Sequence, residues 1–576
     1  MTLAMEFLRR QLAKGGALPE LSVLAVAVGL VTGLVVLLFR WAIEGASWLI
    51  HGQAADGHDA LGLELRVCLP ILGAILLGVL LNRLPPDSRR FGVVHVMERL
   101  ARHRGRLPWR GAVNQFVGGA FGLAMGLSGG REGPAVHLGA ATSSLLGEAF
   151  RLPDNCVRTL VACGTAAAIG ASFNTPMAGV IFAMEVVMME YAIVSFIPII
   201  IATVTATVLS RWFLGDVIEF RGLETDLRTL LEVPYIMFAG LVVGFVGGLF
   251  IALVKTFAQL RRWPFWAQAS LAGAITGVAA IVAPEALGVG YDTVNDALLD
   301  NFAWTALLII LVAKTVASAA CVGVGLPVGV IGPTLVMGAL LGGLLGAAGN
   351  ALAPDLASDT PLYVMLGMAG MMAAVLQAPL AALVAVLELT ANPKVILPAM
   401  LIIAVATLTV GQLLRQRSVL LTTLATFGVR YPPHPAAQHL MRVGVDSLMS
   451  RSVVQLPQCP ALSELKNALA DDPDWMVIDV PGGLPMVLNA AEVVAYHDGR
   501  ADQTAPVDLL ATPLDRENAG IVDVRATLQE ALTELNRVGS NALCVTRPAS
   551  RKPVEDEHLA VVGVLTRKDI ERQAWW

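Results

Sequence analysis

The sequence predicts a mostly helical, polytopic membrane protein whose membrane part repeats one helical plan, followed by a soluble α/β tail. Hydrophobic residues make up 56% of the 576-residue chain and charged residues 15%, whereas soluble domains carry about a quarter charged residues. The mean hydropathy is +0.68. Apolar segments recur through residues 21–427, and beyond residue 443 short apolar runs alternate with amphipathic stretches.

Charge is distributed unevenly between these two regions. Residues 443–576 contain 20 acidic and 12 basic residues, and such an acidic tail argues against a nucleic-acid partner. The six cysteines are scattered, without the spacing of a metal site or of a disulfide framework. We therefore expect neither.

Residues 1–20 are basic and are expected on the cytoplasmic side, because Arg9, Arg10 and Lys14 precede the first span. Several of the apolar stretches that follow are too short to cross a hydrocarbon core of about 30 Å. Short apolar helices interrupted by Gly and Pro predict broken helices that meet around a cavity. The stretches are 21–50, 67–84, 113–127, 157–171, 177–189, 193–214, 234–258, 271–282, 306–322, 334–351, 362–376, 380–389 and 395–414.

The stretch 126–139, GLSGGREGPAVHLG, places an Arg-Glu pair inside this apolar region. Ionisable residues at membrane depth are costly and mark a pathway or a polar cavity. The glycines allow close backbone approach, and Pro134 suits the first turn of a helix. A helix beginning at Glu132 would aim free N–H groups at one point and attract an anion there. The Glu132 carboxylate would occupy this point when no anion is bound.

Two other interpretations of this stretch remain open. Glu132 is also explained as a first-turn carboxylate paired with Arg131. Residues 126–130 have the Gly-x-Ser-x-Gly form of an intramembrane serine protease, which needs a histidine base. After His137 the next histidine is His434, beyond the last apolar segment, so this enzyme is disfavoured. We expect His137 to pack or to form a hydrogen bond, with a pH-sensing role as the alternative.

An internal repeat organises the membrane region. The segments NTPMA (174–178) and QAPLA (377–381) are each followed by a glutamate nine residues after the proline, Glu185 and Glu388. Upstream, the Gly-Pro pairs at 133–134 and 332–333 precede these prolines by 42 and 46 residues. Two copies of one plan predict a transporter or channel whose site lies where the halves meet.

The second half has its own counterpart of the Arg-Glu stretch. Residues 325–333, GLPVGVIGP, again set up a helix N-terminus, so Val330 and Ile331 are expected to present backbone N–H groups. Residues 90–97, RFGVVHVM, are a weaker third element. Residues 428–442 are a linker by composition, and residues 443–576 form the soluble α/β tail.

These motifs together resemble the CLC family of chloride channels and proton/chloride exchangers. The resemblance covers roughly residues 21–427, and the tail resembles two tandem CBS domains. Taken together, the motifs of the membrane region are highly specific for this family. They are GREGP at 130–134, FNTPMAG at 173–179 followed by Glu185, GVIGP at 329–333 in the place of the family's GxFxP, and 377–388.

The resemblance implies an inverted-repeat fold in the cell membrane, as a homodimer with a pore in each subunit and both termini cytoplasmic. It implies that Glu132 is the gating glutamate, and it requires no cofactor beyond chloride or another monovalent anion as ligand. The anion-binding positions that it implies are Gly130, Arg131, Gly133, Pro134, Val330, Ile331, Phe91 and Leu420.

Three positions depart from the family pattern. Phe91 stands where the family has a coordinating serine, and Leu420 lies nearest the place of its coordinating tyrosine. Each lost hydrogen bond weakens the central anion site by about 1 kcal/mol. Val186 follows Glu185 where many exchangers carry an inner proton-transfer glutamate. Glu185 and Glu388 are alternative relays, or they cap helix ends.

The missing inner carboxylate favours uncoupled conduction. We therefore expect a voltage- or pH-gated anion channel and no enzyme, with a proton/chloride antiporter as the alternative. A third possibility is a nucleotide sensor, because Thr566 and Asp569 stand where CBS domains hold an adenosine ribose. Asp569 is equally explained as a helix-start carboxylate.

Overall fold

The computed structural model describes residues 18–54, 57–191, 193–216, 219–220, 225–429, 431, 435–480, 483–498, 507–547 and 560–574. They form two compact units. Leu21–Phe150 with Arg158–Pro432 makes the first unit, and Pro433–Trp576 with Arg151–Val157 belongs to the second. The expected basic segment falls largely on residues 1–17, outside the described residues.

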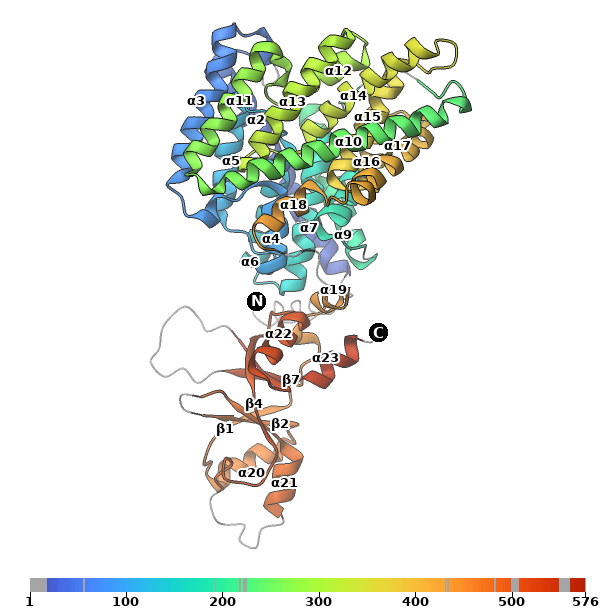
Figure 1. Ribbon diagram of the computed structural model, residues 1–576. Helices are drawn as coiled ribbons and strands as arrows, with labels where there is room; N and C mark the ends of the chain where they lie inside the picture. The colour runs from blue at the N-terminus through green and yellow to red at the C-terminus, as the bar shows by residue number, and fades with distance from the viewer. Residues whose placement is uncertain are drawn as a thin grey trace. The chain divides into compact units, whose positions relative to one another are not determined.

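The first unit consists of long and short helices at varied tilts (Figure 1). Within the described residues, nine helices are long and apolar enough to cross a membrane, which confirms the polytopic architecture. The first half holds α2 (Leu18–His51), α3 (Leu63–Asn82), α4 (Gly92–Arg102), α5 (Trp109–Ala124), α6 (Glu132–Ala149), α7 (Asp154–Phe173), α8 (Pro176–Phe182) and α9 (Ile193–Leu214). The second half holds α10 (Val233–Ala258), α11 (Phe265–Val282), α12 (Tyr291–Leu298), α13 (Trp304–Val324), α14 (Ile331–Leu352), α15 (Thr360–Leu376), α16 (Pro379–Thr390), α17 (Ile396–Leu408) and α18 (Val419–Thr426).

The short helices begin where the repeat motifs predict them. α8 and α16 each begin at the proline of their motif, where the missing N–H of proline has no intrahelical partner. α6 begins at Glu132 and α14 at Ile331, just before the two Gly-Pro pairs. The same local signals therefore start corresponding helices in both halves.

Two elements differ from the sequence prediction. α12 was not predicted, because its eight residues, YDTVNDAL, are too few and too polar to stand out as an apolar segment. Part of the predicted linker forms a short helix, α19 (Pro435–Met441). A proline in its first turn followed by two alanines favours this helix locally.

The tail repeats one β-α-β-β-α unit and confirms the predicted α/β region. In each unit the first two strands are parallel and the third is antiparallel to the second, within sheets ordered β1-β2-β3-β4 and β5-β6-β7. The first β-α-β-β-α repeat of the tail contains β1 (Val453–Pro457), α20 (Leu462–Ala470), β2 (Trp475–Asp479), β3 (Met486–Asn489) and α21 (Ala490–Asp498), with β4 (Arg516–Asn518) added at the edge of its sheet. The second contains β5 (Gly520–Asp523), α22 (Leu528–Val538), β6 (Ala542–Thr546), β7 (Val561–Thr566) and α23 (Arg567–Ala574).

Candidate functional site

The loops that precede α6 and α14 pair with each other at the centre of the first unit. The Gly130 N–H donates to the Gly329 carbonyl at 2.8 Å, and the Gly329 N–H donates to the Gly130 carbonyl at 2.7 Å. A Cβ built on Gly133 would lie 2.6 Å from the Gly329 Cα, so only glycine allows the two backbones to approach this closely. The two halves thus bring two helix N-termini together.

The carboxylate of Glu132 lies at this meeting point. The side chain is fully buried, and its Oε1 accepts a hydrogen bond from the hydroxyl of Tyr291. Its Oε2 has no hydrogen-bond partner among the described residues, and a Cβ built on Gly332 would lie 3.2 Å from it. The carboxylate therefore occupies the point at which the sequence predicts an anion.

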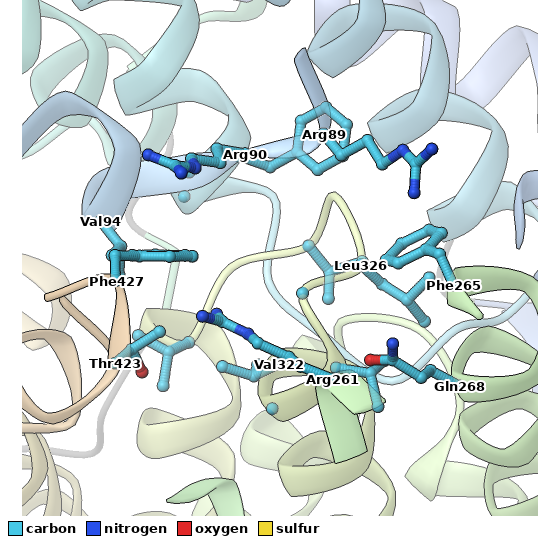
Figure 2. Close-up of a pocket in the computed structure, with 18 of the residues that line it drawn as sticks. Arg89, Arg90, Val94, Arg261, Phe265, Gln268, Val322, Leu326, Thr423 and Phe427 are labelled. Atoms are coloured by element: carbon cyan, nitrogen blue, oxygen red, sulfur yellow. The ribbon is translucent and has the colours of Figure 1, made fainter. Parts of the chain in front are cut away.

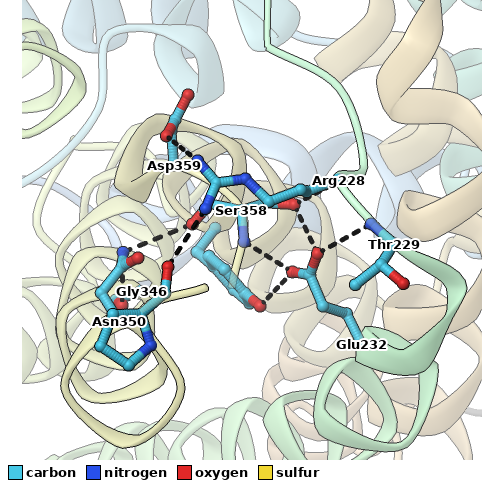
Figure 3. A network of polar contacts seen from close by, with 9 residues as sticks. Arg228, Thr229, Glu232, Gly346, Asn350, Ser358 and Asp359 are labelled. Atoms are coloured by element: carbon cyan, nitrogen blue, oxygen red, sulfur yellow. Dashed lines mark hydrogen bonds and ion pairs between the residues drawn. The ribbon is translucent and has the colours of Figure 1, made fainter. Parts of the chain in front are cut away.

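A second buried carboxylate shows what a purely structural glutamate looks like (Figure 3). Glu232 accepts hydrogen bonds from the Ser358 N–H at 2.9 Å, the Ser358 hydroxyl at 2.7 Å and the Tyr363 hydroxyl at 2.7 Å. Both of its oxygens are satisfied, as expected for a buried polar group that holds helices together. The unpartnered Oε2 of Glu132 is different, and it leaves one oxygen for a ligand or a proton.

Tyr291 is a site residue that the sequence reasoning missed. It opens α12 and is buried against Phe173 and Phe220, with ring centroids 5.9 and 5.5 Å away. The guanidinium of Arg131 lies 5.2 Å from the centre of its ring. Tyr291 stands 159 residues from Glu132 in the chain, so no spacing signal connects the two.

Arg131 is held by a second carboxylate in addition to Glu132. Its Nη2 lies 2.8 Å from Glu219 Oε1, whereas its Nε lies 3.8 Å from Glu132 Oε1. The shorter contact ties the guanidinium to Glu219. Arg131 therefore supplies positive charge beside the site, and Glu132 stays free to exchange partners.

Buried Lys314 holds the loop that leads to Tyr291. Its Nζ donates to the carbonyls of Ala286, Leu287 and Gly288 at 3.3, 3.3 and 2.9 Å. The Gly288 carbonyl also accepts the Gly129 N–H at 3.2 Å. Lys314 thus fixes one loop that contacts Gly129, the residue before the GREGP motif. The sequence reasoning missed this residue too, because a single lysine in an apolar helix does not reveal which carbonyls it meets.

A basic cavity of about 430 Å³ opens beside the paired loops (Figure 2). Four predicted anion-binding residues, Phe91, Gly133, Val330 and Leu420, line it together. Ile331 is the first residue of α14 and Pro134 lies in the first turn of α6; neither is among the lining residues.

Three arginines that the sequence reasoning missed, Arg89, Arg90 and Arg261, also line this cavity. Figure 2 shows Phe427 between Arg90 and Arg261, whose guanidinium carbons lie 4.9 and 4.1 Å from the centre of its ring. Positive charges around a cavity raise the local concentration of anions. Thr423 offers a hydroxyl one helical turn beyond Leu420, although its Oγ1 donates to the Val419 carbonyl at 2.8 Å.

The remaining predicted residues have local partners. Glu185 accepts hydrogen bonds from the first turn of α16, and Val186 is buried. In the tail, the Asp569 carboxylate accepts the Thr566 N–H at 3.2 Å and the Thr566 hydroxyl accepts the Asp569 N–H at 3.3 Å, which is the capping pattern of a helix start. The Ser128 hydroxyl lies 2.9 Å from the Ser318 hydroxyl, and among the described residues no hydrogen bond joins it to a histidine that could serve as the base of a protease.

Comparison with known proteins points to one family. A family model described as voltage gated chloride channel matches residues 73–411. A ClcB-like chloride channel protein of Ralstonia nicotianae is 34% identical over 392 residues, which cover 66% of this chain and 91% of the relative. The H(+)/Cl(-) exchange transporter ClcA of Salmonella agona is 30% identical over 433 residues, which cover 72% of this chain and 90% of the relative. The crystal structure of a slow cyanobacterial Cl-/H+ antiporter has the same fold, with a TM-score of 0.64 at 22% identity over 71% of this chain and 97% of that chain.

Proposed function

This chain belongs to the CLC family, and we propose that it exchanges protons for chloride across a membrane. The expectation from the sequence, that the protein is an uncoupled channel, is wrong. The ClcA relative is an H(+)/Cl(-) exchange transporter, and the similar solved structure is that of an antiporter. The expectation rested on Val186 alone, and the loss of one relay side chain does not decide between the two mechanisms.

The observation that carries the proposal is the position of Glu132. Its carboxylate lies where the N-termini of α6 and α14 meet, and one of its oxygens has no hydrogen-bond donor in the described structure. When ionised, this carboxylate competes with chloride for the positive ends of the two helices. When protonated, it loses its charge and yields the position to chloride. One group thereby links proton binding to anion movement.

The cavity supplies the anion to this point. Arg89, Arg90 and Arg261 attract chloride, and the backbone around Gly133 and Val330 receives it. Phe91 and Leu420 offer no hydroxyl, so the central site relies on backbone dipoles. We expect this site to bind chloride weakly and to discriminate little among small monovalent anions.

The test compares proton and chloride movement in liposomes that contain the purified full-length protein. A chloride gradient alone should drive protons against their own gradient, and the reversal potential should move with the pH gradient. Glu132→Gln removes the titrating oxygen and should give pH-independent chloride flux without proton movement. A reversal potential that stays at the chloride equilibrium value in the unmodified protein would overturn the proposal.

We propose further that the tail is a CBS pair and that the protein is a homodimer. The duplicated β-α-β-β-α unit supports the first of these. Adenine nucleotide is the proposed ligand, with Thr566 and Asp569 at the ribose. Calorimetry with ATP on the full-length protein should show binding that Asp569→Ala abolishes, and the absence of binding at millimolar ATP would exclude this role. The mass of the detergent-solubilised protein tests the dimer.

A further inference from the structure

The guanidinium of Arg131 is shared by two carboxylates, one buried and one partly exposed. Arg131 Nη2 lies 2.8 Å from Glu219 Oε1, and Arg131 Nε lies 3.8 Å from Glu132 Oε1. The side chain of Glu132 is 0% exposed, whereas that of Glu219 is 18% exposed. The two carboxylates therefore compete for one positive charge, and Glu219 is the closer of the two.

The residue after Glu219 fixes the position of this carboxylate. Phe220 is fully buried, and its ring lies edge-on to the ring of Tyr291, with centroids 5.5 Å apart. The Phe220 N–H donates to the carbonyl of Leu389, in the last turn of α16, at 3.2 Å. Because its neighbour is held by both side chain and backbone, Glu219 stays beside Arg131.

Tyr291 connects the two carboxylates through Arg131. Its hydroxyl donates to Glu132, and the guanidinium of Arg131 lies 5.2 Å from the centre of its ring. A cation at this distance from an aromatic ring is attracted to it. A displacement of about 1 Å would bring Arg131 Nε within hydrogen-bond distance of Glu132. Arg131 can thus contact Glu132 once Glu219 releases it.

Resting on the proposed exchange function, we propose that Glu219 is a positioning residue that keeps Arg131 away from Glu132 and thereby sets the pH at which Glu132 yields its place to chloride. A close ion pair with Arg131 stabilises the ionised form of Glu132, and the negative charge of Glu219 destabilises it. While Glu219 holds the guanidinium, Glu132 is protonated at a higher pH than it would be with Arg131 as its direct partner.

Among the described residues, the charges that act on the Glu132 carboxylate are those of Arg131 and Glu219. Asp292, which follows Tyr291 in α12, is exposed. The other charged groups on the surrounding elements have partners of their own. These are Arg40 with Glu44 in α2, Arg211 at the end of α9 with Asp216, Lys314 in α13 with the carbonyls of residues 286–288, and Glu388 in α16 with the first turn of α8.

The experiment measures chloride flux between pH 4 and 9 in liposomes that contain the full-length protein with Glu219→Gln. Glutamine keeps the size of the side chain and removes its charge, so Arg131 becomes available to Glu132. We expect half-maximal flux at a pH lower by roughly one unit. Removal of the Tyr291 hydroxyl would shift the profile in the opposite direction, so general damage to the site does not imitate this result.

Two further variants separate the hold on Arg131 from other effects. Asp216→Asn removes a nearby carboxylate that pairs with Arg211 at 3.3 Å, and it should keep the profile of the unmodified protein. Glu219→Asp keeps the negative charge but is one methylene shorter, so its contact with Arg131 exceeds hydrogen-bond distance. We expect Glu219→Asp to shift half-maximal flux to lower pH by a smaller amount. An unchanged profile for Glu219→Asp would show that charge alone matters, and the positioning role would be wrong.

The possible results distinguish this inference from the proposed function. A reversal potential that stays at the chloride equilibrium value overturns the exchange, whereas the pH profile of the flux tests Glu219. If the flux of the unmodified protein does not depend on pH, the gating role of Glu132 fails and the inference fails with it. If that flux depends on pH and Glu219→Gln leaves half-maximal flux at the same pH or a higher one, the inference alone is wrong.

The thermal unfolding midpoint of each variant is measured in parallel. A loss of folded protein lowers the flux at every pH alike, so it leaves the pH of half-maximal flux unchanged. A shift of this pH to a lower value therefore supports the inference even where stability falls. If Glu219→Gln abolishes the flux at every pH while the protein stays folded, Glu219 is needed for transport itself, and a role limited to positioning Arg131 is overturned.

Discussion

Glu185 and Glu388 cap each other's helices across the internal repeat. The Glu185 carboxylate, in the π-helical turn Ala183–Met188 that continues α8, accepts hydrogen bonds from the first turn of α16 at 3.2 and 2.7 Å. The Glu388 carboxylate, near the end of α16, accepts hydrogen bonds from the first turn of α8 at 3.0 and 2.8 Å. The shared spacing of nine residues from proline to glutamate thus has a structural cause.

We expect Glu185→Gln and Glu388→Gln to destabilise the protein alike. Each change removes a charged cap at a helix N-terminus, worth about 1 kcal/mol, and should lower the thermal unfolding midpoint in detergent. Glu44→Gln, which weakens a half-buried ion pair with Arg40 in α2, should have little effect. If Glu185 serves only as a cap, its variant keeps the proton-to-chloride ratio. If the proton-to-chloride ratio of the Glu185→Gln variant falls while its thermal unfolding midpoint is unchanged, Glu185 is a proton relay.

Tyr291→Phe should change the pH dependence of transport. The tyrosine hydroxyl donates to the ionised Glu132 carboxylate, and such a bond is worth about 1.5–3 kcal/mol. Without it the ionised form is less stable, so protonation, and with it half-maximal transport, should occur at a pH higher by roughly one to two units. The measurement is the chloride flux between pH 4 and 9.

Tyr363→Phe is the matched control for this change. Its hydroxyl also donates to a buried glutamate, Glu232, at 2.7 Å. Glu232 keeps the donors of Ser358, so this variant should lose stability without a shift of the pH profile. Equal profiles for Tyr291→Phe and the unmodified protein would mean that Tyr291 only packs against Glu132.

The sequence was sufficient to predict the helix starts of the site, because their signals are local. Proline in a first turn, glycine where backbones approach and a carboxylate at a helix N-terminus can each be recognised from neighbouring residues. Glu132, Gly133 and Val330 were identified in this way, and the structure places them close to the paired loops.

The sequence was not sufficient to predict residues whose role depends on distant contacts. Tyr291 meets Glu132 across 159 residues, and Lys314 meets the carbonyls before Tyr291 only after α13 has packed. Arg261 reaches the cavity from the 3-10 turn Gln259–Arg262, which follows α10. Single polar residues in apolar helices give no periodic pattern, so their partners become known only from the fold.

Cys544 should resist thiol reagents in the folded tail. Burial raises the pKa of its thiol to about 12, so about one thiol in ten thousand is ionised at pH 8. Cys459 is exposed and should be alkylated first. Mass spectrometry after iodoacetamide treatment with and without denaturant checks this. Equal labelling of both cysteines without denaturant would show that the core around β6 opens readily.

Gly133→Ala should disrupt the pairing of the two loops. The new Cβ would lie 2.6 Å from the Gly329 Cα, and the backbone must move to relieve the clash. Overpacking of this kind costs about 1–3 kcal/mol. The hydrogen bonds between Gly130 and Gly329 would shift with it, and a displacement of about 1 Å at a site can reduce activity about 100-fold.

Gly45→Ala in α2 is the matched control for this change, because a Cβ there meets no atom within 4 Å. Alanine in place of a helical glycine is favourable by about 1 kcal/mol, so this variant should be as stable as the unmodified protein or more so. Chloride flux and thermal unfolding are measured on both variants. If Gly133→Ala transports like Gly45→Ala, the close approach of the two loops is not needed for anion passage, and the site must lie elsewhere along the cavity.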